Sequence, residues 1–185
     1  TEVVARLTPG EFRAPAWSPD GRRLGYVDAG QPDREFLAIY TMGESRGEIV
    51  CPVDGQTVML WSPDGRQLAV SQALGDSPHH LSGLSLVDVE SGQTRRIDDG
   101  DLVSFFWSPC SGKLVAMSFE ERSGMRWQAI DVRDESRAIG EPFYPSRELV
   151  YFCWFFDQFA SSHPLISPDG THLTFAGHMP ERIEE

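Results

Sequence analysis

Apolar and polar residues alternate in short runs along this chain, and the runs end at turns rich in Gly, Pro and Asp. This pattern is typical of β-strands joined by tight turns. The clearest case is the segment 61–70, which reads WSPDGRQLAV. In such a turn Pro presets φ, Asp can accept a hydrogen bond from the backbone two residues on, and Gly supplies a left-handed conformation. The segment therefore predicts a hairpin whose flanking apolar residues lie on neighbouring antiparallel strands.

The same motif recurs at 17–24, 107–114 and 166–173, and in every copy a leucine follows the first residue by seven positions. The copies are 44, 46 and 59 residues apart. These intervals lie near or just above the period of propeller blades and predict a repeat protein.

The repeats predict an all-β fold, a β-propeller of four-stranded antiparallel blades. We expect one domain or segment over 1–185, with repeats at about 10–53, 54–98, 99–140 and 163–185 and an insertion at 140–162. Residues 3–7 read as the last strand of a preceding blade. The other predicted strands are 13–18, 23–28, 35–42 and 48–51; 57–62, 67–72, 81–89 and 94–97; 103–108, 113–119, 125–132 and 137–139; and 163–167 and 172–177.

The insertion contains the longest apolar run of the chain, residues 149–156. It is either a short helix or an extra extended segment. We favour the helix, because Ser146 can cap its first turn and Glu148 would lie in that turn. We expect the aromatic residues of the insertion to serve internal packing rather than a binding surface.

The four motifs resemble the TolB-type, WD-like β-propeller repeat, an apolar residue with Ser-Pro-Asp-Gly followed by a Leu/Ile-Ala-Phe/Val strand. The segment 155–163, FFDQFASSH, is also similar to a segment of uncharacterised bacterial members. The resemblance implies a propeller that binds proteins or ligands, or that caps a peptidase domain, usually without chemistry of its own. It also implies a periplasmic location. The chain departs from the motif at Cys110-Ser111, which replaces Asp-Gly, and at Ile166, which replaces Trp.

Charge and composition narrow the partners. The 185 residues carry a net charge of −12 and a pI near 4.8, which argues against nucleic-acid binding. The acidic balance fits a cationic protein partner or simply solubility. No run approaches the length of a membrane span, so we expect none. Cys51, Cys110 and Cys153 form no CxxC pair and resemble neither a disulfide framework nor a zinc site.

Candidate catalytic and metal-binding residues are few. Residues 43–47, GESRG, match the GxSxG pattern of serine hydrolases but lie between two predicted strands, where they read as a hairpin turn. The acidic run 98–101 lacks the ligand spacing of an EF-hand. His79 and His80 are adjacent and would point apart on an extended chain. His163, His172 and His178 read as packing or surface residues. We therefore expect no catalytic residue, no metal and no cofactor.

Propeller connectivity places the loops on two sides. The turns between the first and second and between the third and fourth strands of each blade emerge on one side, which we call the A–B side. The other connections, which include a loop at 73–80 and a link at 98–101, vary in length and emerge on the opposite, B–C side. Variable loops on a rigid scaffold tend to carry function. We expect binding there through Asp33, Arg34, Asp76, His79, His80, Asp99, Asp101, Glu120 and Glu121.

Three functions fit this reading: a non-catalytic module for protein–protein interaction or scaffolding, the gating propeller of a prolyl-oligopeptidase-like serine hydrolase, or a small-ligand binder at the central opening.

Fifteen predicted strands leave a blade unfinished. We expect more blades in a longer protein; a homodimer and closure by residues 3–7 are the alternatives. Within the blades, we expect Trp17, Trp61 and Trp107 at equivalent buried positions beside Leu24, Leu68 and Leu114.

Overall fold

The computed structural model describes residues 15–31, 34–53, 55–75, 77–120, 124–162 and 164–179. The chain divides into two compact units, Thr1–Asp99 and Gly100–Glu185, and each is described here by itself. The predicted strand 3–7 lies outside the described residues.

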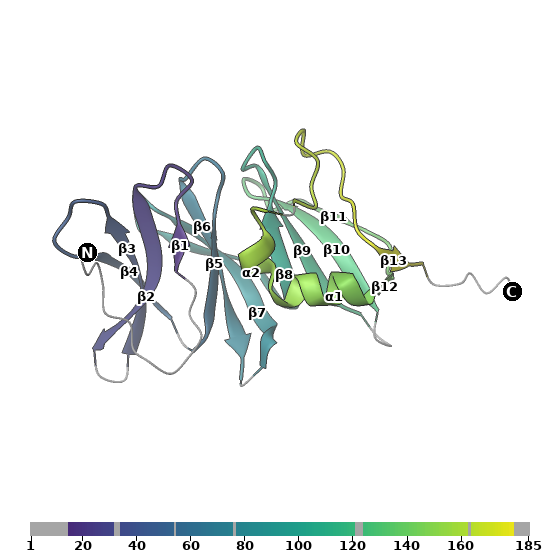
Figure 1. The fold of residues 1–185 in the computed structure, drawn as a ribbon, viewed down its shortest axis with the longest axis horizontal. Helices are drawn as coiled ribbons and strands as arrows, with labels where there is room; N and C mark the ends of the chain where they lie inside the picture. Colours follow the sequence, from purple (N-terminus) through teal and green to yellow (C-terminus); the bar gives the residue numbers. More distant parts are fainter. Residues whose placement is uncertain are drawn as a thin grey trace, which may run out of the picture. The chain divides into compact units, whose positions relative to one another are not determined.

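The first unit contains two antiparallel blades (Figure 1). The first blade has the order β1-β2-β3-β4, and the second begins with β5, β6 and β7. Both follow the predicted up-and-down order, so the all-β propeller prediction is confirmed here. The strands are β1 (Ala16–Trp17), β2 (Arg23–Gln31), β3 (Arg34–Thr41), β4 (Glu48–Val53), β5 (Thr57–Trp61), β6 (Gln67–Leu74) and β7 (Ser77–Asp88).

One long strand, β8 (Thr94–Trp107), replaces the two strands predicted at 94–97 and 103–108. The sheet order places β8 next to β7, and its later residues pair with β9, from Leu102↔Ser118 to Trp107↔Leu114. The seven-stranded order β11-β10-β9-β8-β7-β6-β5 is therefore two four-stranded blades that share one strand. The acidic residues at 98–101 are poor strand formers, but pairing at both ends keeps them extended.

The second unit continues from β8 with β9 (Lys113–Phe119), β10 (Met125–Asp131) and β11 (Arg137–Ile139). The fourth repeat is shorter than predicted. Its hairpin is reduced to an isolated bridge between Ile166 and Leu173, and the short β13 (Gly177–His178) pairs with β12 (Tyr144–Pro145).

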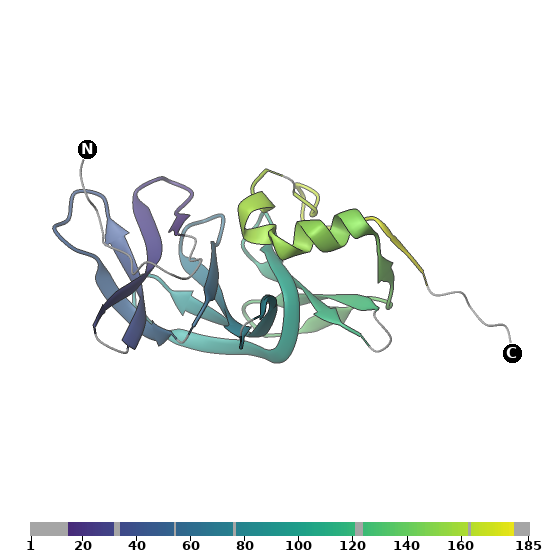
Figure 2. The same cartoon turned by 60° about the horizontal axis from the view of Figure 1, so that its bottom comes forward.

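The insertion folds as the predicted helix. α1 spans Arg147–Trp154, and the Ser146 hydroxyl caps it by accepting a hydrogen bond of 3.1 Å from the Leu149 amide. A second short helix, α2 (Phe156–Phe159), follows, and Figure 2 shows both helices beside the blade that starts with β8. The helix prediction and its cap are confirmed, because both depend on local sequence.

Aromatic side chains anchor this insertion on β8. Phe156 lies with its ring centroid 5.0 Å from Phe105 and 5.6 Å from Phe106, and Phe152 stacks on Phe106 at 5.7 Å. On the outer side of α1, however, Tyr151 and Trp154 are 58% and 43% exposed. The expectation of internal packing is confirmed for Phe152 and Phe156 and wrong for Tyr151 and Trp154.

The core of the first unit lies between its two blades and centres on Trp61. Trp61 is buried, and its Nε1 donates a hydrogen bond of 2.8 Å to the carbonyl oxygen of Ala16 on β1. The Arg23 guanidinium lies 5.6 Å from the ring centroid of Trp61, within cation–π range. The indole thus joins the first strand of one blade to the first strand of the next.

The predicted equivalence of the three tryptophans holds only in part. Leu68 and Leu114 are fully buried as expected, whereas Trp107 and Leu24 are partly buried. Trp17 is 54% exposed, so the prediction for it is wrong. Trp61 is covered by the blade before it, whereas β1 is the edge of its sheet and the described residues contain no strand beyond it.

Trp61→Ala should lower the free energy of unfolding by about 3–5 kcal/mol, because it removes a large buried ring and leaves the Ala16 carbonyl without its donor. Urea titration monitored by circular dichroism measures this. Trp17→Ala is the matched control and should cost less than about 1 kcal/mol. Equal losses for the two variants would contradict the assignment of Trp61 as the residue that joins the blades.

Candidate functional site

The turn of the repeat is built the same way in each blade. In the first blade the Ser18 hydroxyl donates to Asp20 Oδ1 at 2.6 Å and accepts from the Arg23 amide at 2.9 Å, while the Arg22 amide donates to the same carboxylate oxygen at 3.0 Å. The turns at 62–67 and 167–172 repeat all three bonds. The prediction that the Asp side chain accepts a hydrogen bond from the amide two residues on is confirmed. The Ser hydroxyl, the Asp carboxylate and the two amides thus find their hydrogen-bond partners within the turn.

These bonds hold the aspartates in the ionised state. The Ser18 hydroxyl and the Arg22 amide lower the pKa of Asp20. Bonds from Ser167 and Thr171 lower the pKa of Asp169 to about 2, and the Thr171 hydroxyl lies 2.7 Å from its Oδ1. Burial would raise the pKa of Asp64, but the donors at Ser62 and Arg66 outweigh it and the pKa is lowered.

The third blade forms the same turn with different residues. Ser108 Oγ lies 3.4 Å from Cys110 Sγ and accepts from the Lys113 amide at 3.0 Å. Ser111 takes the glycine position with φ of 57°, close to the φ of 69° at Gly65. The departure from Asp-Gly therefore leaves the turn intact but places a non-glycine residue in the left-handed region.

The three cysteines are free thiols in different surroundings. Cys110 is exposed, and its pKa is lowered, chiefly by the bond with Ser108. Burial raises the pKa of Cys51, and it raises that of Cys153 to about 11. At neutral pH the Cys153 thiol is therefore protonated, and it packs in the interior.

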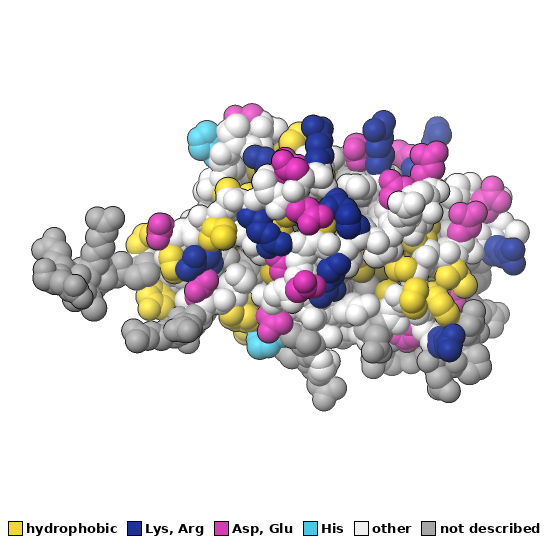
Figure 3. Space-filling view, turned by 180° about the vertical axis from the view of Figure 1, so that it is seen from behind, with side chains coloured by type: hydrophobic (Ala, Val, Ile, Leu, Met, Phe, Trp, Pro, Cys, Tyr) yellow, Lys and Arg dark blue, Asp and Glu magenta, His cyan; other side chains and the backbone are white. Residues whose placement is uncertain are grey.

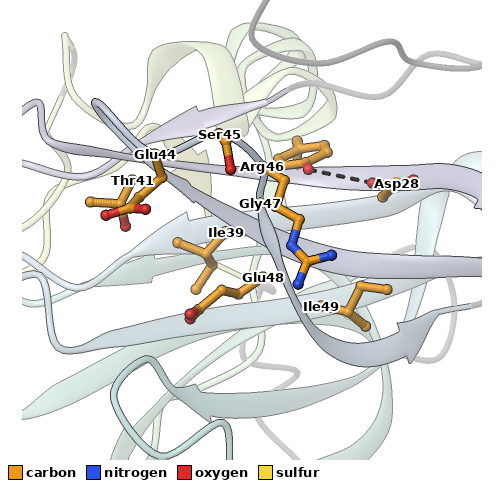
Figure 4. Close-up of a pocket in the computed structure, with 10 residues that line it drawn as sticks. Asp28, Ile39, Thr41, Glu44, Ser45, Arg46, Gly47, Glu48 and Ile49 are labelled. Atoms are coloured by element: carbon orange, nitrogen blue, oxygen red, sulfur yellow. Dashed lines mark hydrogen bonds between the residues drawn. The ribbon is translucent and has the colours of Figure 1, made fainter.

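The GESRG segment lies beside a concavity of about 800 Å³ in the first unit (Figure 4). β3 ends at Thr41 and β4 begins at Glu48, so the segment joins two strands and opens no helix. Ser45 and Arg46 line the concavity, together with Glu44 and Glu48, and no histidine is among the described residues around it. The hairpin-turn prediction is confirmed, and Ser45 lacks the strand–turn–helix setting of a hydrolase nucleophile.

Gly47, at the end of this segment, lies close against Tyr26. A Cβ at Gly47 would overlap the hydroxyl of Tyr26, which itself lies 3.4 Å from Asp28 Oδ2. Burial, and then the charge of Asp28, raise the pKa of Tyr26. Sequence reasoning treated the segment only as a turn and missed Arg46, whose side chain extends along the concavity in Figure 4.

Four of the nine predicted binding residues fall outside what the structure describes: Asp33, Asp76 and Glu121 entirely, and His79 in its side chain. The other five come from different elements. Arg34 begins β3, His80 lies on β7, Asp99 and Asp101 lie on β8, and Glu120 follows β9; all are exposed except Glu120, which is partly buried.

Two corrections concern the connections that carry these residues. The loop predicted at 73–80 is mostly strand, because Leu74 pairs with Ser77 and β6 and β7 form a hairpin. The link predicted at 98–101 is part of β8. Ion pairs involve two of the acids: Asp99 Oδ1 lies 3.1 Å from Arg96 Nε, and Glu120 Oε1 lies 2.7 Å from Arg126 Nε. The connections are shorter and more regular than the sequence indicated.

The remaining candidates are three histidines, of which the structure describes two. His172 is exposed with its Nδ1 2.7 Å from the Thr171 hydroxyl, His178 is exposed on β13, and His163 lies outside the described residues. In the part of the chain that the structure describes, no group of three or more His, Cys, Asp or Glu side chains could hold a metal ion. No described helix is long and apolar enough to cross a membrane.

Known proteins share parts of this sequence and this fold. No family model matches the chain. Over 73 residues, 37% of this chain, it is 40% identical to the uncharacterized peptidase YuxL of Bacillus subtilis, of which the match covers 11%. Over 59 residues, 31% of this chain, it is 36% identical to the Tol-Pal system protein TolB of Alcanivorax borkumensis, of which the match covers 14%.

A solved structure, that of a putative TolB from Agrobacterium tumefaciens, superposes with a TM-score of 0.58 at 17% identity. The superposition covers 94% of this chain and 61% of that one. The chain has a TolB-like β-propeller fold. The resemblance in the repeat motifs is therefore confirmed. The matches cover 11% and 14% of the two sequence relatives and 61% of the solved structure, less than two thirds in each case.

Ser111→Gly should raise the free energy of unfolding by about 1 kcal/mol. Glycine adopts the left-handed conformation of the third turn without the steric cost that a Cβ carries. Gly65→Ser is the matched control at the equivalent position and should lower stability by a similar amount, because it places a Cβ in the same left-handed conformation. The space around the new Cβ adds no clash, since its nearest neighbour would be Pro19 Cδ at 3.8 Å. Urea midpoints measure both, and shifts of the same sign in the two variants would contradict the equivalence of the turns.

The acid stability of the propeller should depend on Asp169. Because its pKa in the folded state is about 2, below the ordinary value of 3.8, its ionised form favours folding above that ordinary value. This contribution should disappear as the pH falls to about 2. Thr171→Val should move the titration midpoint of the Asp169 carboxyl back toward 3.8, as measured by NMR. An unchanged midpoint would contradict the role of Thr171.

Proposed function

We propose that this TolB-like propeller is a non-catalytic protein-binding module whose partner engages the B–C side. The observation that supports this is a difference between the two sides. On the A–B side the Ser and Asp side chains of the repeated turns are engaged in bonds within the turn. On the B–C side of the first unit Arg34 and His80 are exposed near the beginnings of β3 and β7.

The charge of the chain favours a cationic partner. The net charge of −12 would speed association with a basic protein and make its rate sensitive to salt. On the face shown in Figure 3, acidic and basic side chains are interspersed, so the effect would come from the overall charge rather than from one acidic patch there. We therefore expect a complementary surface that contains some acidic groups as well.

A second function, the gating propeller of a prolyl-oligopeptidase-like serine hydrolase, is favoured by the similarity to peptidase YuxL. In that case the catalytic residues would belong to another domain, and this propeller would control access to them. The parent reading frame decides between the two: an adjoining α/β-hydrolase sequence with a nucleophile elbow would favour the peptidase role.

Alanine at Arg34 and His80 together should weaken binding of a partner captured by crosslinking in the source cells by about ten-fold or more, since exposed contacts typically contribute a fraction of a kcal/mol to a few kcal/mol each. Surface plasmon resonance at low and high salt measures affinity and association rate with purified proteins. Association should also slow as salt rises.

The matched control replaces exposed residues of the A–B side, Arg22, Arg66 and Glu90, whose side chains take no part in the turn bonds described above. It should leave the affinity within about two-fold of the parent chain. Loss of binding in the control variant, with no loss in the B–C variant and both proteins folded, would reverse the assignment of sides.

A further inference from the structure

The first blade carries the concavity of about 800 Å³ that is bordered by the turn between β3 and β4 (Figure 4). The described walls come from this blade alone. Asp28 belongs to β2, Ile39 to β3 and Ile49 to β4, and the turn itself supplies the rim. Because the blade contains all of its strands, β1 to β4, the concavity is a feature of a finished sheet.

The turn on the rim is longer than its counterpart in the second blade. Residues 42–47 join β3 to β4, whereas residues 89–93 join β7 to β8, so the turn of the first blade is one residue longer. Thr41 and Asp88 hold equivalent positions, since each pairs with the first residue of the second strand of its blade. The first blade thus has a hydroxyl where the second blade has a carboxylate.

This difference changes what the polar side chains of the turn do. In the second blade the amide and the hydroxyl of Ser91 both donate to Asp88 Oδ1, at 2.8 and 2.7 Å. In the first blade neither the Ser45 hydroxyl nor the Arg46 guanidinium has a hydrogen-bond or ion-pair partner among the described residues. Their donors are therefore available to a ligand in the concavity.

The concavity also brings opposite charges together without pairing them. Glu44 and Glu48 line it together with Arg46, yet in the part of the chain that the structure describes no ion pair joins Arg46 to either carboxylate. All three residues are exposed. An aliphatic surface adjoins them, because Ile49 also lines the concavity and is 53% exposed.

A ligand with a single charge fits this arrangement poorly. A simple anion at Arg46 would lie in the same concavity as two carboxylates, and a simple cation at Glu48 would lie in the same concavity as a guanidinium. A ligand that carries both charges satisfies both kinds of group at once.

We propose that this concavity binds a ligand with a carboxylate and a cation joined by a short aliphatic stem, the chemistry of a basic amino acid, either free or at the C-terminus of a peptide. The ligand carboxylate accepts hydrogen bonds from the planar fork of the Arg46 guanidinium and from the Ser45 hydroxyl. The ligand cation pairs with Glu48, and the stem lies on Ile49. The site belongs to the A–B side, so it is separate from the B–C side and goes beyond the function proposed above.

NMR titration of the isotope-labelled 185-residue chain with L-lysine tests the proposal. The Ser45, Arg46 and Gly47 amides should show saturable shifts, with a Kd of about 1 mM or tighter. L-lysinamide lacks the carboxylate and L-norleucine lacks the side-chain ammonium group, so each should bind about five-fold or more weakly. Equal affinity for the three compounds, or shifts that do not saturate, would overturn the proposal.

Two variants assign the two charged contacts. Arg46→Gln should remove the preference for L-lysine over L-lysinamide, and Glu48→Gln should remove the preference over L-norleucine, because each variant loses the partner of one ligand group. Arg133→Gln and Glu90→Gln change exposed residues in the corresponding turns of the third and second blades, and as matched controls they should keep both preferences. Preferences that persist in Arg46→Gln and Glu48→Gln would overturn the proposal. If a variant does not fold, the comparison of the three compounds on the parent chain decides.

Nα-acetyl-L-lysine separates the two sources of such a ligand, because its acetyl group replaces the α-ammonium group as a preceding peptide bond would. An affinity equal to that of L-lysine would support the proposal with the C-terminus of a peptide as the source. An affinity about five-fold weaker would support it with the free amino acid as the source. No detectable binding of either compound would overturn it.

Discussion

Every repeat in this chain depends on one short-range interaction, the serine hydroxyl that closes the turn between the first two strands of a blade. It donates to the side chain two residues on and accepts from the amide five residues on, as Ser18 does with Asp20 and Arg23. Both partners lie within the motif, so the turn needs no help from the rest of the protein. It persists even where Cys110 and Ser111 replace Asp and Gly. The hairpin is thus the unit from which the sheets are built.

Contacts between blades depend on residues that are far apart in sequence. The Trp61 indole reaches Ala16, 45 residues earlier, and closes the core of the first unit. In the second unit, Phe105, Phe106, Phe152 and Phe156 hold the helical insertion on β8 through ring contacts. Aromatic side chains suit this task, because they bury a large area and can bridge elements that share no backbone hydrogen bonds.

The proposed binding role follows the same division. Polar groups of the repeated turns are engaged in local bonds, whereas Arg34 is exposed at the start of a paired strand, β3. A rigid propeller of this kind can present partners with a surface at little entropic cost. It also explains why Ser45, in a turn between β3 and β4, has the sequence of a hydrolase motif without its geometry.

The sequence by itself determined the repeat, the hairpins and the capped helix at Ser146, since each rests on neighbours within a few residues. Only the tertiary structure decided that residues 94–107 form one strand, that residues 73–80 join a hairpin, and that Trp17 is exposed while Trp61 is buried. Trp17 and Trp61 both open the sequence WSPDGR, but among the described residues only Trp61 is covered by a neighbouring strand. Strand pairing and burial depend on groups brought together from distant parts of the chain, which no local pattern records.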